Sequence, residues 1–188
     1  FTALHVYVDK RPLFFPFLLS LVHDLAGYRV GNAFALNAFL SLVFITLVFL
    51  VGRRLGGQPA GWAAVLLAAS IPLVHQNVAS SGFELLNLVM ILATLWFGMR
   101  YAEKPDTDRL GAFVLAGILL AQTRYESVLF ILPVGVVILY QWWRQRAVDL
   151  SWPVMVAPLL LVIVPLHFNV FKLASTSWQL TDGPGADT

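Results

Sequence analysis

The chain of 188 residues contains no cysteine, so it forms neither disulfide bonds nor thiolate metal sites. Charged side chains are also scarce, at 12% of the sequence against about 25% in average soluble domains. The formal net charge of +2 gives no basis for nucleic-acid binding, which depends on clustered Lys and Arg. Hydrophobic residues instead make up 59% of the chain, which is the composition of a membrane protein.

Motifs of soluble enzymes are missing as well. The sequence has no P-loop, no Gly-x-Ser-x-Gly, no His-Glu-x-x-His and no dinucleotide-binding glycine pattern. The four histidines do not share the spacing of metal ligands. The remaining candidates for catalytic or binding residues are the polar side chains near the predicted membrane surface.

Long apolar stretches separated by short polar connections predict an all-α fold, a polytopic bundle of about six transmembrane helices. Residues 12–26 are too short and too amphipathic to span, so they predict an extracytoplasmic juxtamembrane helix that ends at Gly27. The expected spans are 32–52, 59–78, 83–100, 110–123, 126–143 and 152–172. The expected organisation is an extracytoplasmic loop with the interfacial helix (1–30), the six-helix region (31–172) and the start of another extracytoplasmic loop (173–188).

The distribution of cations predicts the orientation, because cytoplasmic loops are enriched in Lys and Arg. The larger set of cations lies in one group of loops and comprises Arg53, Arg54, Arg100, Lys104, Arg109, Arg144 and Arg146. The smaller set lies on the other side and comprises Lys10, Arg11, Arg29, Arg124 and Lys172. We therefore expect the first group in the cytoplasm and both ends of the chain outside it.

Residues 122–126 (QTRYE) should lie below the outer membrane surface. The helix that leads to them from Arg109 is about 18 Å long at about 1.5 Å per residue, well short of a hydrocarbon core of about 30 Å. A turn at that depth must be buried in protein or line a wet cavity. Arg124 and Glu126 therefore either form a structural salt bridge or line a cavity, together with Tyr125.

Glu84 lies at the outer end of its predicted span, about 24 Å of helix away from Arg100. It either lines the same cavity or is a carboxylate favoured by the dipole at a helix N-terminus. In the second interpretation Ser80 or Ser81 would cap the helix.

A dense group of charges, Asp9, Lys10 and Arg11, precedes the rigid Pro12 and an aromatic run. Arg binds phosphate through two donors and Lys as a point charge, so Lys10 and Arg11 are candidates for a donor phosphate, or else for bulk anionic lipid. Pro12 favours the first because it sets the start of the helix and hence the direction of the charges. His5 and Asp9 share a face if helical and either begin a divalent-metal site or are exposed loop residues.

Several segments occur in a recognisable order: 9–19, 27–29, 32–37, 52–56 and 120–126. In this order they resemble the GT-C glycosyltransferases, and more narrowly the protein mannosyltransferase and aminoarabinose transferase branch of bacterial membrane enzymes. The resemblance covers most of residues 5–145. It implies the transfer of a sugar from a polyprenyl-phosphate donor to an acceptor on the outer face of the bacterial inner membrane.

The resemblance also implies a divalent metal in many members, such as Mg²⁺, Mn²⁺ or Zn²⁺. By position, Asp9 matches an acid near the metal, Lys10 a cation for the donor phosphate and Arg124 a further one. The catalytic carboxylate of the family follows its first membrane helix. We therefore expect the general base upstream of residue 1, and the chain alone to be inactive.

The leading hypothesis is thus part of a membrane glycosyltransferase, whose partners are the lipid-linked donor and membrane lipids. The acceptor is left open, and no nucleic acid is expected. A competing interpretation is a transporter or flippase for an anionic or lipid-linked substrate, with the 122–126 turn as its gate. The inverted repeat that would favour it is not found in the sequence. A third interpretation is a scaffold in which every buried polar group is simply paired.

Overall fold

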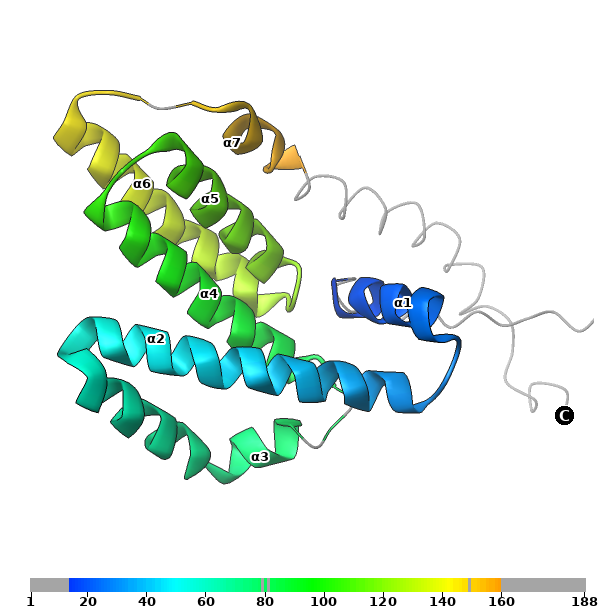
Figure 1. Ribbon diagram of the computed structural model, residues 1–188. Helices are drawn as coiled ribbons and strands as arrows, with labels where there is room; N and C mark the ends of the chain where they lie inside the picture. The colour runs from blue at the N-terminus through cyan, green and yellow to red at the C-terminus, as the bar shows by residue number, and fades with distance from the viewer. Residues whose placement is uncertain (1–13, 79, 81, 149, 160–188) are drawn as a thin grey trace, which may run out of the picture.

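The computed structural model describes residues 14–78, 80, 82–148 and 150–159, and every regular element within them is helical (Figure 1). The elements are α1 (Phe14–Ala26), α2 (Gly31–Ala69), α3 (Pro72–Val78), α4 (Glu84–Glu103), α5 (Thr107–Ala121), the 3₁₀ helix η1 (Glu126–Phe130), α6 (Ile131–Gln145) and α7 (Trp152–Val156). The predicted all-α fold is confirmed. The predicted site residues His5, Asp9, Lys10 and Arg11 lie outside the described residues.

Helix α2 is a hairpin that reverses direction at Gly56 and Gly57, inside the polar connection predicted between the first two spans (Figure 1). Gly57 has φ +78° and ψ −174°, a conformation that is essentially restricted to glycine. The two limbs pack closely, because a Cβ on Gly52 would lie 2.8 Å from that of Ala64. Small residues therefore permit both the turn and the contact between the limbs.

The predicted second span, 59–78, is not one continuous helix. Helix α2 ends at Ala69, and α3 begins at Pro72. Proline has no backbone N–H to continue the ladder and disfavours helical geometry at the preceding residue, Ile71. The sequence contained this signal, and the prediction of an unbroken helix was wrong.

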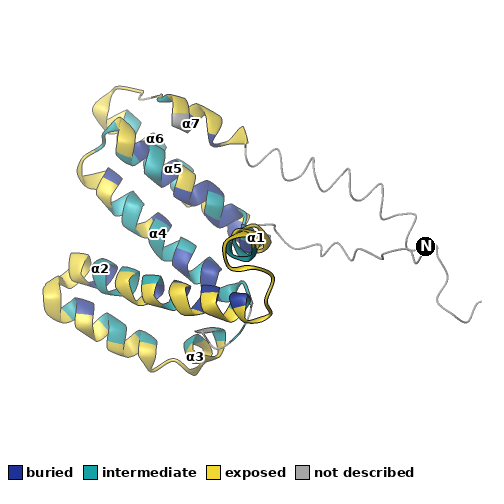
Figure 2. Ribbon diagram, turned by 45° about the vertical axis from the view of Figure 1, so that its right-hand side comes forward, coloured by how far each residue is buried: buried dark blue, intermediate teal, exposed yellow. Residues whose placement is uncertain are grey.

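Two apolar clusters hold the bundle together along α4. The first joins α1, α2 and the N-terminal half of α4 through Phe15, Leu36, Leu40, Phe44, Leu85, Leu86 and Val89. The second joins the end of α4 to α5 and the segment around α7 through Tyr101, Leu110, Phe113, Val114, Ile118, Val154 and Ala157. In Figure 2 the α2 hairpin is largely exposed, whereas α5 carries a nearly continuous run of buried and half-buried residues.

Three of the described helical segments are long and apolar enough to cross a membrane: Gly31–Ala69, Glu84–Glu103 and Glu126–Gln145. Large apolar side chains on them are exposed, including Phe39 at 62% and Leu132 at 69%. Such surfaces are stable against lipid or further helices rather than water. Helix α1 has 13 residues, too few to span, as predicted for an interfacial helix, and it ends before Gly27 at φ +79°.

The connections gather at two opposite ends of the bundle. At the Arg54 end, Arg54 pairs with Glu103, and Arg109 pairs with Asp106 at 3.2 Å and donates to the Arg100 carbonyl at 3.0 Å. The Arg124 end comprises the N-termini of α2 and α4 and the turn between α5 and η1. The described members of the two predicted sets of cations separate between these ends.

Candidate functional site

The turn between α5 and η1 lies beside the first turn of α4 rather than beyond its N-terminus, because α5 is the shorter of the two helices. Helix α5 has 15 residues and is about 22 Å long, whereas α4 has 20 residues and is about 30 Å long. The two helices pack antiparallel, so α5 stops before it reaches the N-terminus of α4. The turn consequently rests on Asn87 in the first turn of α4, which begins at Glu84.

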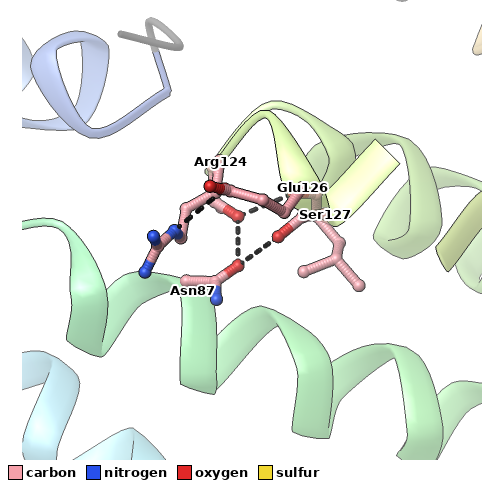
Figure 3. Close-up of polar contacts among 6 residues, drawn as sticks. Asn87, Arg124, Glu126 and Ser127 are labelled. Carbon is pink, nitrogen blue, oxygen red and sulfur yellow. Dashed lines mark hydrogen bonds and ion pairs between the residues drawn. The ribbon is translucent and has the colours of Figure 1, made fainter. Parts of the chain in front are cut away.

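Asn87 on α4 is the anchor of this turn (Figure 3). Its Oδ1 accepts hydrogen bonds from the hydroxyls of Thr123 and Ser127, each at 2.6 Å. Both hydroxyl residues are buried, with exposed fractions of 2% and 3%. The Thr123 hydroxyl also lies 2.7 Å from the Leu120 carbonyl oxygen, so its one proton is shared. The network fastens the turn to α4 on both sides of Arg124.

Arg124 and Glu126, which the sequence placed together, form an ion pair between Nε and Oε2 at 3.3 Å (Figure 3). Their side chains remain 39% and 72% exposed, so this is not a buried structural salt bridge. The Arg124 guanidinium carbon also lies 5.7 Å from the centre of the Phe83 ring, within the range of a cation–π contact. Its two Nη groups make no hydrogen bond to any described residue.

Glu84, which we expected beside this cluster, begins α4 at the same end. The residue before it, Phe83, is the N-cap and makes no side-chain capping bond. Ser80 does not cap the helix, because its hydroxyl donates to the Asn77 carbonyl at 2.9 Å and accepts from the Gly82 N–H. The expectation was therefore wrong for Ser80, whereas Ser81 lies outside the described residues. Glu84 occupies the favourable position for a carboxylate at the helix N-terminus.

Asparagines also fasten the other connections at this end. The fully buried Asn37 of α2 donates through Nδ2 to the carbonyls of Ser80 and Gly82, at 2.7 and 3.0 Å. Asn32 makes Nδ2 contacts of 2.8 Å with His23 Nδ1 and 2.7 Å with the Gly27 carbonyl, which ties α1 to α2. The Arg124 end is therefore a preorganised polar region.

Asn32 and Asn37 bounded one of the segments of the family resemblance without a predicted role, and Asn87 was not among the predicted site residues. The available signal was an amide side chain inside an apolar helix, which needs a partner because lipid supplies none. For two of these asparagines the partners lie far away in the chain: Asn87 bonds residues 36 and 40 positions later, and Asn37 bonds residues 43 and 45 positions later. No local pattern identifies these distant partners, whereas Asn32 bonds residues only 9 and 5 positions earlier.

Metal ligation stays a prediction, because His5 and Asp9 lie outside the described residues. Within the described part of the chain, no group of three or more His, Cys, Asp or Glu side chains is arranged to hold a metal ion. Glu84 and Glu126 therefore do not by themselves form such a site.

The helices, the exposed apolar surface and the polar Arg124 end define a multi-pass α-helical membrane protein with a candidate site at one end of its bundle. Residues 10–168 match the model of the dolichyl-phosphate-mannose-protein mannosyltransferase family. Because this match covers most of the chain, the chain belongs to that family of GT-C membrane glycosyltransferases, and the predicted resemblance is confirmed. No curated protein and no solved structure matches the chain. Family membership favours the transferase over the transporter and the scaffold.

Proposed function

We propose that the chain forms part of an enzyme that transfers a sugar from a polyprenyl-phosphate donor to an acceptor on the outer face of a bacterial inner membrane. Family membership supports a membrane glycosyltransferase in general. The observation that carries the finer proposal is Arg124, a cation held on a fastened turn with both Nη groups free of described partners.

Arg124 would stabilise the departing lipid phosphate. When the bond between the sugar and the phosphate oxygen breaks, negative charge develops on the phosphate. A guanidinium offers planar, charge-assisted hydrogen bonds to two of its oxygens. Among the described residues the ion pair with Glu126 engages only Nε, so the Nη edge would be available to the ligand. Such stabilisation is strongest when the donor group is held in place before the reaction.

Lys10 and Arg11 are proposed as further phosphate cations, and Asp9 with His5 as ligands of a divalent metal. These residues precede α1, which packs against α2 at the Arg124 end through Phe15. If the metal is bound there, it would neutralise phosphate charge as a Lewis acid. Tyr125 and Glu84 are proposed to line the cavity beside Arg124, together with Glu126.

The test measures binding and transfer by the full-length protein. Purified wild type, Arg124→Gln and the control Arg53→Gln would be titrated with radiolabelled polyprenyl phosphate. Arg53 is an exposed arginine at the opposite end of the bundle. Loss of charge-assisted hydrogen bonds should weaken binding by Arg124→Gln about tenfold to a hundredfold. The control should bind as wild type does.

Transfer is followed in membranes that contain the same variants, from radiolabelled polyprenyl-phosphate mannose to endogenous acceptors, with membranes lacking the protein as background. The kcat/KM for the donor should fall at least as far as binding does, because charge on the phosphate grows in the transition state. Normal binding and normal transfer by Arg124→Gln, at saturating and at subsaturating donor, would refute the role of Arg124.

A further inference from the structure

We propose that Asn87 is a positioning residue for Arg124, an inference that rests on the proposed function. Asn87 does not itself reach a ligand in this role. One atom, its Oδ1, accepts hydrogen bonds from the residue before Arg124 and from the residue after Glu126 (Figure 3). Residues 124–126 therefore lie between two residues that are both hydrogen-bonded to the same oxygen atom.

The Asn87 Oδ1 atom has no acceptor capacity left once both hydroxyls are bound to it. A carbonyl oxygen has two lone pairs, and two hydroxyls occupy them at 2.6 Å each. Both hydroxyl residues are almost completely buried. Loss of the Asn87 acceptor would leave the Ser127 hydroxyl without a partner among the described residues and the Thr123 hydroxyl with the Leu120 carbonyl alone. Displacement of the turn would therefore break both hydrogen bonds to Asn87 in a place that is largely shielded from water.

The same turn of α4 also supports the guanidinium itself. Phe83 and Asn87 lie four residues apart, so they share one face of the helix. The Asn87 N–H donates to the Phe83 carbonyl at 3.1 Å, which links the two positions rigidly. One face of α4 thus presents an aromatic ring to the cation and an amide to the turn that carries it.

If Asn87 positions Arg124, replacing Asn87 should lower activity only while Arg124 is present. The Asn87→Leu variant removes the acceptor and keeps a similar volume. Because displacement of a catalytic group by about 1 Å can cost up to a hundredfold, kcat/KM for the donor should fall about tenfold to a hundredfold. In the Arg124→Gln background the same change should have an effect of no more than about twofold, because the group being positioned is already gone. Binding of radiolabelled polyprenyl phosphate should show the same pattern.

A second set of variants tests the hydrogen bond without altering Asn87. Thr123→Val removes the hydroxyl and keeps the shape, whereas Thr123→Ser keeps the hydroxyl. Thr123→Val should lower kcat/KM for the donor in the same direction as Asn87→Leu, and Thr123→Ser should restore most of it. The control is Thr94→Val, because Thr94 is a buried α4 residue whose hydroxyl bonds only the Met90 carbonyl among the described residues. Thr94→Val should leave kcat/KM for the donor unchanged.

The outcomes separate the two proposals. Absence of transfer by the wild-type protein above the background membranes would refute the proposed function. A normal Arg124→Gln enzyme would refute the phosphate role of Arg124 and the positioning role together. An impaired Arg124→Gln enzyme with normal Asn87→Leu and Thr123→Val enzymes would refute the positioning role alone. Losses that multiply in the Asn87→Leu, Arg124→Gln double variant would also refute it, because they would show that Asn87 supports the fold independently of Arg124. If Asn87→Leu does not fold, the Thr123 series with and without Arg124→Gln gives the same decision.

Discussion

Replacement of Gly57 by alanine should destabilise the α2 hairpin through the backbone alone. Gly57 holds φ +78° and ψ −174° at the reversal, a region essentially closed to residues that carry a Cβ. Steric crowding makes no contribution, because the nearest heavy atom to a new Cβ would be Pro59 Cδ at 3.9 Å. The cost of this conformation is therefore about 1–3 kcal/mol of unfolding free energy.

Thermal unfolding of the full-length protein in detergent measures this effect. For about 150–250 residues, about 1 kcal/mol shifts Tm by about 2–4 °C and a longer chain shifts less, so Gly57→Ala should melt below wild type by up to about 12 °C. Gly135→Ala is the matched control, because Gly135 is inside α6 and a Cβ there would meet nothing within 4 Å. The control should melt at or above wild type, since alanine is favoured over glycine in a helix by about 1 kcal/mol. If Gly57→Ala melted together with Gly135→Ala, the argument that backbone geometry restricts this position to glycine would fail.

Two further predictions concern charges. Lys10→Ala in the full-length enzyme should lower kcat for transfer while its Tm stays within about 2 °C of wild type, because a single charge at the membrane surface, where the sequence predicts Lys10, stabilises a fold little; normal transfer at all donor concentrations would contradict its role at the phosphate. Arg54→Gln and Glu103→Gln should each reduce the unfolding free energy by no more than about 1 kcal/mol, because both side chains of this pair are more than a third exposed. The double variant should be no less stable than the worse single one, and a much larger loss in a thermal melt would show that the pair holds the hairpin against α4.

Local features of the sequence were sufficient for much of the architecture. Apolar stretches predicted a helical membrane protein, and the described part of the chain is helical with three segments of spanning length. The reversal near Gly56 and the end of α1 before Gly27 follow from the conformational freedom of glycine, which does not depend on distant contacts. The helix break before Pro72 also has a local cause, the proline itself. It was missed because the span 59–78 was predicted from its apolar composition alone.

The features of the Arg124 site also fall into those that follow from the sequence and those that depend on the tertiary structure. By itself, the sequence determined that Arg124 and Glu126 are neighbours, that the helix before them is short, and that family motifs surround them. Only the tertiary structure decided that Asn87 holds their turn and that Asn37 holds the loop before α4. The physical reason is that helix length and glycine geometry are properties of adjacent residues. A buried amide finds its partners only when helices far apart in the chain have packed together.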